Sequence, residues 1–518
     1  MVVAVLWFRK CLRVHDNEAL TWACNSEEVD SILPIFIIDD EQQDSGKGNI
    51  GFNRMRFLSE SLKNLDENLR GTLGTSLTIL SGKISDALHS IREGLPGEDV
   101  CLVYEYCSEP GSRETDMLLG NWPSSESSNF RTKVFPAMHT LLDIEEVVNS
   151  QGYRNPKSIK DMEGIFRDYF GRNELGFYEI GDPLPVPSKK KPLATLTDRG
   201  NVIEISEFDR MIRDRFPDKG DQHHYFPGGE AEALDRLKKK VSDRPQYVNK
   251  FRKPKTISTN SEDDPREPST TGLSPYLSTG CLSVRMLWKE CEKSYLSDEH
   301  TEPPESLHGQ MMFREMFYLL SRSVKNWDSD IDNENCKEIG WDDFDLQKMV
   351  AWETGNTGYP YIDAMMRQLE ETGWIHHLGR HAVSCFLTRG QLWQNWTYGR
   401  DIFERKLVDS DWALNNGNWL WLAGVAPFSM PYYRIYNPCP DSKSSLNAET
   451  TNADFIRYWV PELKSFPSKY IFEPHLAPIS IQKSLNCIIG EDYPLPIVDR
   501  KESRKENLIR FKISIGNQ

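Results

Sequence analysis

The sequence predicts a two-part fold, an α/β unit followed by a large all-helical unit. Short apolar runs at residues 2–8, 32–38, 77–80 and 100–104 alternate with amphipathic stretches at 53–69 and 84–91. That alternation predicts a parallel, doubly wound sheet that is covered by helices. From about residue 228 the apolar spacing becomes helical and stays helical to about residue 510.

We expect four segments along the chain. Residues 1–135 form the α/β domain, 136–215 a connector rich in Pro, Lys and Asp, 216–500 the all-helical domain and 501–518 a short C-terminal tail without an obvious aromatic plug. Ligands of a parallel sheet bind beyond the carboxyl ends of its strands, which here points to the loops after Ile38 and Tyr104. The first strand–helix turn has no GxGxxG, so an ordinary dinucleotide fingerprint is absent.

Composition excludes several function classes. No run of eighteen apolar residues is present, so no membrane span is expected. The ten cysteines include no CxxC pair, which favours a reducing compartment and free thiols. The formal net charge of −16 disfavours a protein that lives on a phosphate backbone, although a local basic patch could still bind DNA. No metal site is predicted.

The residues between 373 and 421 concentrate tryptophan among ionisable groups. Eleven of the fourteen tryptophans follow residue 287, and five lie between Trp393 and Trp421. A large aromatic core would explain any single one of them. His377 and His381, however, are spaced i, i+4 with Arg380 alongside, so on a helix they share one face. Such a face needs a polar or charged partner, and a cofactor is one candidate.

Two further patterns suit a ligand. Thr270, Thr271, Leu273 and Ser274 precede a predicted helix, where hydroxyls and free N–H groups suit a phosphate, although many helices begin with such caps. Asp409 and Asp411 stand in an apolar setting, and a buried carboxylate there would need a partner such as Arg380.

The chain resembles the cryptochrome/photolyase family. The segments that carry the resemblance are TTGLSPYLSTGCLS, GQMMFRE, TGYPYIDAMMRQL, GWIHHLGRH and DSDWALNNGNWLW, and the similarity runs from LWFRKCLRVHDNEAL to DYPLPIVD. Within the family, the likeness is greatest to animal light-receptive cryptochromes and (6-4) photolyases.

The resemblance implies FAD bound in the helical domain. It places Thr270, Thr271, Leu273 and Ser274 at the phosphates, Gln310 and Arg314 on a cofactor-facing helix, and Arg380 and Asp409 as an ion pair beside the flavin ring. Asn415 would face flavin N5, with Asp411 near the other ring edge and His377 and His381 close by. It also implies an electron-transfer chain formed by Trp419, Trp396, Trp341 and Trp393. A second, antenna chromophore is not expected, because neither strand-end loop carries a decisive signature.

Three functions stay open. The first is a blue-light photoreceptor in which FAD, photoreduced through the tryptophan chain to a radical, triggers conformational signalling in circadian or light entrainment. The second is a (6-4) photolyase, an enzyme in which reduced FAD injects an electron into a flipped-out DNA lesion beside His377 and His381. Lys253, Arg434 and Tyr436 would then meet DNA, but Phe313 replaces the tryptophan usual in lesion-binding members. The third is a light-independent repressor of the clock.

The resemblance also implies partners and location. We expect clock or signalling proteins as partners, leave a homo-oligomer open, and expect DNA as a partner only under the repair hypothesis. No membrane association is expected, and the location is expected to be cytoplasmic and nuclear.

Overall fold

The computed structural model describes residues 1–39, 50–120, 130–197, 200–219, 225–252, 264, 266–296, 299–440 and 452–516. The chain divides into two compact units: the first comprises Met1–Lys250 and Leu273–Ser323, and the second comprises Phe251–Gly272 and Val324–Gln518. The predicted segment boundaries at residues 135, 215 and 500 are not tested by this division and stay predictions.

A six-stranded sheet lies at the centre of the first unit, in the strand order β5-β4-β1-β2-β3-β6. All neighbouring pairs are parallel except β3 with β6, which is antiparallel. The strands are β1 (Val2–Trp7), β2 (Ser31–Ile38), β3 (Thr78–Ser81), β4 (Asp99–Glu105), β5 (Phe130–Phe135) and β6 (Val202–Ile203). The predicted parallel α/β fold is therefore confirmed.

Helices bury the sheet, as continuous apolar strands require. The alternate residues Val3, Val5 and Trp7 of β1 share one core with residues of α4 (Ile84–Gly94) and α5 (Pro110–Gly120). Helix α1 (Glu18–Asn25) contacts β1 and β4. Helix α3 (Phe52–Leu73) ends at Gly74, whose φ of 70° lies in the left-handed region that glycine adopts without strain.

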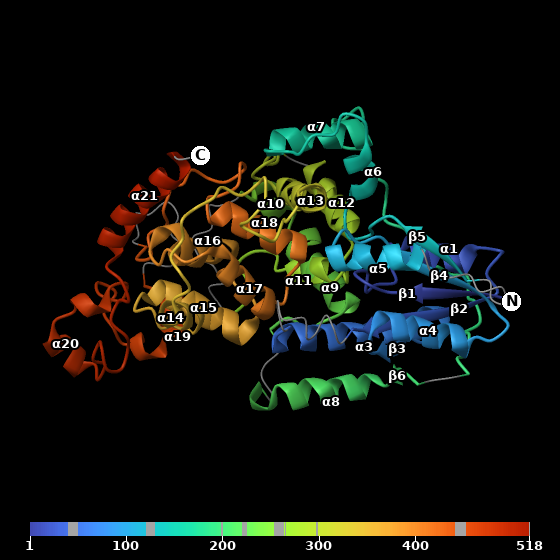
Figure 1. Ribbon diagram of the computed structural model, residues 1–518, viewed down its shortest axis with the longest axis horizontal. Helices are drawn as coiled ribbons and strands as arrows, with labels where there is room; N and C mark the ends of the chain where they lie inside the picture. The colour runs from blue at the N-terminus through green and yellow to red at the C-terminus, as the bar shows by residue number, and fades with distance from the viewer. Residues whose placement is uncertain are drawn as a thin grey trace. The chain divides into compact units, whose positions relative to one another are not determined.

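The predicted connector contains regular structure. It forms α6 (Ile144–Asn149), α7 (Ile159–Phe170), β6 and α8 (Ile205–Arg215). Strand β6 extends the sheet at β3, and α8 packs along α3, as Figure 1 shows. The composition of residues 136–215, rich in Pro, Lys and Asp, did not indicate these elements.

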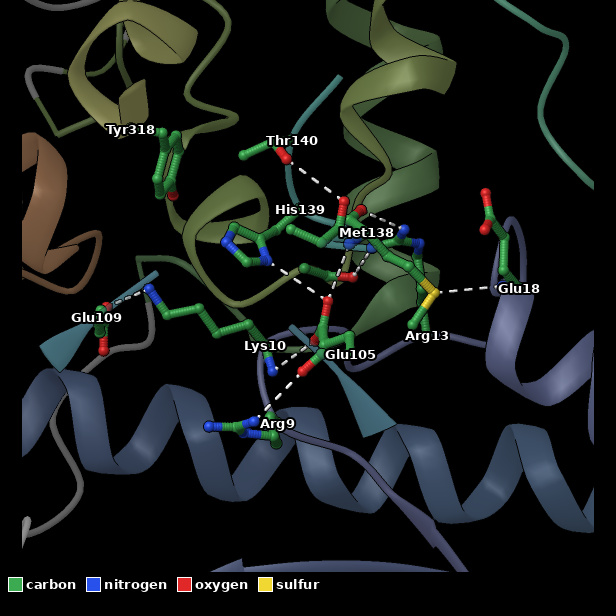
Figure 2. Close-up of polar contacts among 12 residues, drawn as sticks. Arg9, Lys10, Arg13, Glu18, Glu105, Glu109, Met138, His139, Thr140 and Tyr318 are labelled. Atoms are coloured by element: carbon green, nitrogen blue, oxygen red, sulfur yellow. Dashed lines mark hydrogen bonds and ion pairs between the residues drawn. The ribbon is translucent and has the colours of Figure 1, made fainter. Parts of the chain in front are cut away.

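The end of β4 is held by buried polar contacts within the first unit (Figure 2). Glu105, 2% exposed, accepts hydrogen bonds from Lys10 N at 2.9 Å and from Met138 N at 3.1 Å, and its carboxylate faces His139 Nδ1 at 3.4 Å. Burial lowers the pKa of His139. Glu105, which follows Tyr104, is thus packed against the protein's own residues, while residues 40–49, after the other strand end, lie outside the described ranges.

The remaining elements of the first unit are helical. They are α9 (Glu230–Leu237), the π-helical turn η2 (Lys238–Ser242), α10 (Pro245–Lys250), α11 (Ser274–Ser278), α12 (Val284–Tyr295) and α13 (Leu307–Ser323), with the 3-10 turn η1 (Pro217–Lys219) after α8.

The second unit contains only helices and loops in its described part. The helices are α14 (Leu346–Glu353), α15 (Pro360–Thr372), α16 (His377–Cys385), α17 (Trp396–Lys406), α18 (Trp412–Leu422), α19 (Asp454–Trp459), α20 (Ile479–Ser484) and α21 (Arg500–Gly516). Shorter turns are η3 (Phe386–Gly390), η4 (Pro461–Leu463) and η5 (Pro474–Leu476). Among the described residues, no helix is both long and apolar enough to cross a membrane.

The predicted tail forms α21, and this helix is anchored by an aromatic side chain. Phe511 is 1% exposed and Asn507 3% exposed, whereas most other residues of the helix face solvent. The Asn507 amide donates to the carbonyls of Gly390 and Gln391 at 3.2 and 3.3 Å. The sequence indicates no obvious aromatic plug in this tail, and the anchoring by Phe511 carries little sequence signal, because a single phenylalanine stands in a charged helix.

Candidate functional site

Helix α16 presents the predicted polar face. Its N-cap is His376, whose Nδ1 accepts a hydrogen bond from Leu378 N at 3.2 Å. From there the helical repeat brings His377, Arg380 and His381 onto neighbouring positions. The ring centroids of His377 and His381 are 6.2 Å apart, with their planes at 83°. The structure therefore brings these three predicted site residues together.

Arg380 and Asp409 form the ion pair that the resemblance implies. Arg380 Nη2 lies 2.8 Å from Asp409 Oδ2, and Arg380 Nε donates to Ile375 O at 2.9 Å. The Asp409 side chain is 4% exposed, so its charge depends on this partner. Its second oxygen, Oδ1, is buried without a hydrogen-bond partner among the described residues. One carboxylate oxygen is thus left to accept a hydrogen bond from a ligand.

Tyr436 contacts the second histidine. Its hydroxyl lies 2.6 Å from His381 Nδ1. Burial raises the pKa of Tyr436 far above its ordinary value, so the hydroxyl stays neutral. When that hydroxyl donates to Nδ1, the proton of the neutral imidazole lies on Nε2. Tyr436, predicted as a DNA-facing residue under the repair hypothesis, also orients His381. Their separation of 55 positions along the chain leaves no sequence signal for this contact.

Helix α18 positions the other acidic and amide candidates. Asp411 is its N-cap and accepts a hydrogen bond from Leu414 N at 3.1 Å. Asn415 donates its amide N–H groups to Arg400 O and to Glu404 Oε2, each at 3.1 Å. Both side chains are buried, and the contacts fix their orientation.

The four predicted electron-transfer tryptophans differ in their ring contacts. Two contact each other, one contacts other aromatic residues, and one, among the described residues, is isolated. Trp341 and Trp393 are in contact, with ring centroids 5.0 Å apart. Trp419 contacts Phe403 at 5.0 Å and Trp352 at 6.3 Å. Trp396, fully buried at the start of α17, makes no ring contact with either group in the described part of the chain.

Sequence reasoning missed Trp352 as a neighbour of Trp419. Helix α17 begins at Trp396 and not at Trp393, since the Asn395 side chain caps it and Trp393 has a φ of 55°. A left-handed residue cannot continue an α-helix. Trp393 is therefore turned away from α17 and packs on Trp341, a position that apolar spacing alone does not indicate.

The remaining candidates are divided between the two units. Gln310, Arg314, Leu273 and Ser274 belong to the first unit, and Thr270 and Thr271 to the second. Gln310 donates to Pro304 O at 3.0 Å. Arg314 donates to the carbonyls of His139 and Leu277 and lies 4.8 Å from the centre of the Tyr318 ring.

Two of these observations bear on the predicted roles. Arg314 is held by partners inside the first unit, so its guanidinium is largely used by the protein itself. Helix α11 begins at Ser274 but has only five residues and no side-chain cap, so it makes a weak phosphate site. Lys253 lies outside the described residues.

Buried polar atoms of the second unit fit a flavin cofactor. Besides Asp409 Oδ1, the hydroxyl of Ser384 and the indole N–H of Trp419 are buried without a partner in the described part of the chain. Ser384 follows Arg380 by one helical turn on α16. Unpartnered buried polar groups are costly, and a ligand that hydrogen-bonds to them removes that cost. A flavin ring, with its carbonyls and N–H group, offers both donors and acceptors.

Comparison with known proteins identifies the class. A family model described as the FAD binding domain of DNA photolyase matches residues 306–513. A second, described as DNA photolyase, matches residues 4–168. The chain is therefore a flavoprotein with a photolyase-type FAD-binding domain.

Relatives and solved structures agree. The chain is 38% identical to a (6-4)DNA photolyase of Arabidopsis thaliana over 97% of its own length and 87% of the relative's. It is 35% identical to Cryptochrome-1 of Sylvia borin, over 99% and 78%. A class III photolyase of Agrobacterium tumefaciens has a TM-score of 0.77 at 25% identity, covering 100% and 98%. A Synechocystis cryptochrome shares the fold, with a TM-score of 0.80 at 23% identity, covering 98% and 99%. The chain belongs to the photolyase/cryptochrome family.

Proposed function

We propose that this chain is a blue-light photoreceptor, in which light-driven reduction of FAD through tryptophans changes the conformation of the C-terminal region. Bound FAD supplies a photo-excitable one-electron acceptor. The protein's own part is to hold FAD beside Arg380 and Asp409, to supply electrons from tryptophan side chains, and to convert the resulting charge change into movement.

The observation that carries this proposal is the contact between α21 and two of the predicted electron donors. Phe511 packs edge-on against Trp341 and Trp393, with ring centroids 6.5 and 6.4 Å apart. It also stacks on Tyr432, at 5.0 Å and an interplanar angle of 2°. Few other residues of α21 are buried, so little free energy holds the helix in place. A change of charge at the tryptophans would act directly on the element that we expect to move.

Charge supports the same reading. The chain carries a formal net charge of −16, which opposes binding to a duplex whose affinity depends on neutralising phosphates. Phe313 also replaces the tryptophan that the resemblance leads one to expect in lesion-binding members.

A (6-4) photolyase is the second candidate. It is favoured by the 38% identity to the plant (6-4) photolyase and by the histidine pair that Tyr436 orients. In that reading, His381 Nε2–H is a possible proton donor to a lesion. A light-independent repressor of the clock is the third candidate, and no contact among the described residues of the second unit favours it.

For the receptor, we expect clock or signalling proteins as partners and a cytoplasmic and nuclear location. DNA is expected as a partner only for the photolyase.

The test uses FAD-loaded protein under blue light. Absorption spectra follow photoreduction and dark recovery, and a (6-4) lesion oligonucleotide is then assayed for repair. Trypsin digestion in light and darkness follows cleavage at the basic residues of α21. The receptor predicts photoreduction, faster cleavage of α21 in light and no repair. Lesion turnover with unchanged cleavage would instead establish the photolyase, and a flavin that is not photoreduced would leave only the repressor.

A further inference from the structure

A cation lies over one of the two contacting tryptophans. The guanidinium carbon of Arg510 is 4.5 Å from the centre of the Trp393 ring. The same guanidinium forms an ion pair with Asp342, the residue next to Trp341. No cation lies over the ring of Trp341 in the described part of the chain. The two rings, 5.0 Å apart, therefore have different electrostatic surroundings.

We propose that Arg510 determines which of these two tryptophans stays oxidised after the pair loses one electron, and that the oxidised ring is Trp341. The inference deepens the proposed function and rests on its electron path. Arg510 touches Trp393 without donating electrons itself, so it is a positioning residue for the oxidised site.

Charge is the first reason. A guanidinium attracts the electron-rich face of a neutral indole. Removing one electron from Trp393 turns that attraction into repulsion between two positive charges. The Asp342 carboxylate weakens this repulsion, because it partly neutralises the charge of Arg510. The uncompensated part of that charge still disfavours oxidation of Trp393, over whose ring the guanidinium lies.

Burial is the second reason. Trp393 is 1% exposed, whereas Trp341 is half-buried. A positive ring is more costly to hold away from water, so solvation also favours Trp341. One contact acts in the opposite direction, because Trp393 Nε1–H donates to Gly340 O at 2.8 Å and this hydrogen bond stabilises an oxidised indole. A neutral acceptor contributes less than a full charge at a comparable distance.

The electron balance is simple. The electron that Trp341 loses passes inward and is the one gained by the photo-excited, oxidised flavin, so one tryptophan is oxidised and one flavin is reduced. No bond changes in this step. The indole N–H of oxidised Trp341 then breaks, and its proton passes to water at the half-buried ring.

The experiment locates the radical in FAD-loaded protein by high-field electron paramagnetic resonance after a blue-light pulse. Trp393→Phe and Trp341→Phe supply the reference spectra of each ring alone. In the wild type we expect the Trp341 spectrum. In Arg510→Gln we expect the ratio of Trp393 to Trp341 radical to rise about tenfold, the effect of removing one nearby charge.

Matched variants separate charge from helix docking. Arg510→Lys retains the charge and should restore the wild-type ratio. Lys512→Gln removes an exposed cation from the same helix, and Asn507→Ala loosens α21 without changing charge. Both should leave the ratio within about twofold of the wild type, because neither changes the charge over Trp393. A shift in Asn507→Ala as large as in Arg510→Gln would overturn the proposal, as would an unchanged ratio in Arg510→Gln.

A second measurement does not need the flavin's photochemistry. Azide radicals, a one-electron oxidant generated by pulse radiolysis, oxidise tryptophan in the same variants, and mass spectrometry locates the products. The same change in ratio is expected. If the azide experiment shows the change in the ratio of Trp393 to Trp341 oxidation while light produces no tryptophan radical, the proposed electron path fails and the role of Arg510 stands. If neither arm shows it, the role of Arg510 is refuted.

Discussion

Asp409 pairs with Arg380 through one carboxylate oxygen only, and its other oxygen is buried without a partner among the described residues. This carboxylate, with one buried oxygen left unpaired, is the feature of the second unit that most directly indicates a bound ligand. It lies between α17 and α18, within reach of α16, so three helices fix its position. Removing it affects both the protein and the cofactor.

Asp409→Ala is predicted to weaken FAD binding about tenfold or more, because Arg380 loses its counter-charge and the flavin loses an acceptor. The free energy of unfolding should fall by about 2 kcal/mol, less than for a fully buried pair, since Arg380 is 22% exposed. Flavin absorbance per protein after dialysis and urea unfolding measure the two effects. Asp235→Ala, which breaks an exposed pair with Lys239, is the control. Full retention of FAD by Asp409→Ala would contradict the assigned site.

Tyr436→Phe is predicted to remove the preference of the His381 ring for a single tautomer. The loss of one buried hydrogen bond should cost about 1 kcal/mol of stability. Nitrogen chemical shifts of labelled histidine should show Nε2–H as the main tautomer in the wild type and a mixture in the variant. Tyr433→Phe, at a mostly exposed ring, serves as the control. Identical histidine spectra in wild type and Tyr436→Phe would show that the hydroxyl does not orient the ring.

Helical spacing was enough to predict the face of α16, because His377, Arg380 and His381 lie within one turn or so of each other. The strands were predictable for a similar reason, as β1, β2 and β4 contain apolar runs buried on both faces and β3 has a buried Ile79-Leu80 pair. Contacts between distant segments were not. The turn of Trp393 onto Trp341 depends on a left-handed residue, and the anchoring of α21 depends on Phe511 and Asn507, two buried residues in a mostly exposed helix.

The buried carboxyl group of Glu315 should make the stability of the first unit depend on pH. It is fully buried, its Oε2 accepts hydrogen bonds from Leu141 N and Leu142 N, and burial raises its pKa to about 7. The folded state therefore binds a proton that the unfolded chain releases near pH 4.5. Stability from this group is greatest below that pH and falls as pH rises towards 7.

Glu315→Gln keeps an oxygen for both backbone donors and cannot ionise. The wild type should therefore lose about 2 kcal/mol relative to this variant between pH 4.5 and pH 7. Urea unfolding at several pH values measures the difference. Glu163→Gln, on the partly exposed side of α7, controls for a general loss of charge. A constant difference between wild type and Glu315→Gln over this range would show that Glu315 ionises in the folded state as it does in the unfolded one.

Trp419→Phe is predicted to slow photoreduction of bound FAD at least about tenfold, because phenylalanine is far harder to oxidise than indole and the free-energy barrier to electron transfer rises. Stability should fall by less than about 1.5 kcal/mol, since the aromatic contacts with Phe403 and Trp352 can be partly kept. Flavin bleaching under constant blue light gives the rate. Trp459→Phe, a buried tryptophan of α19 outside the predicted chain, is the control. Equal rates in both variants would remove Trp419 from the electron path.

Gly399 gives a more indirect test of the same ring. A Cβ on this residue of α17 would lie 2.2 Å from Cη2 of Trp419 and 2.5 Å from Cδ2 of Leu387, far inside normal contact. Gly399→Ala should therefore displace the indole, although alanine favours the helix itself. We expect a net loss of about 1–3 kcal/mol in the free energy of unfolding, as for other overpacked cores.

The displaced ring should also change the rate of photoreduction, since electron transfer depends on the distance and orientation of donor and acceptor. Gly164→Ala is the matched control, because the nearest atom to its added Cβ is the flexible end of Arg167, at 4.0 Å. It should be neutral or slightly stabilising, by less than about 1 kcal/mol. If Gly399→Ala retains both wild-type stability and the wild-type photoreduction rate, the added methyl group is accommodated without displacing the indole. The close contact of Gly399 with Trp419 would then not be what positions that ring.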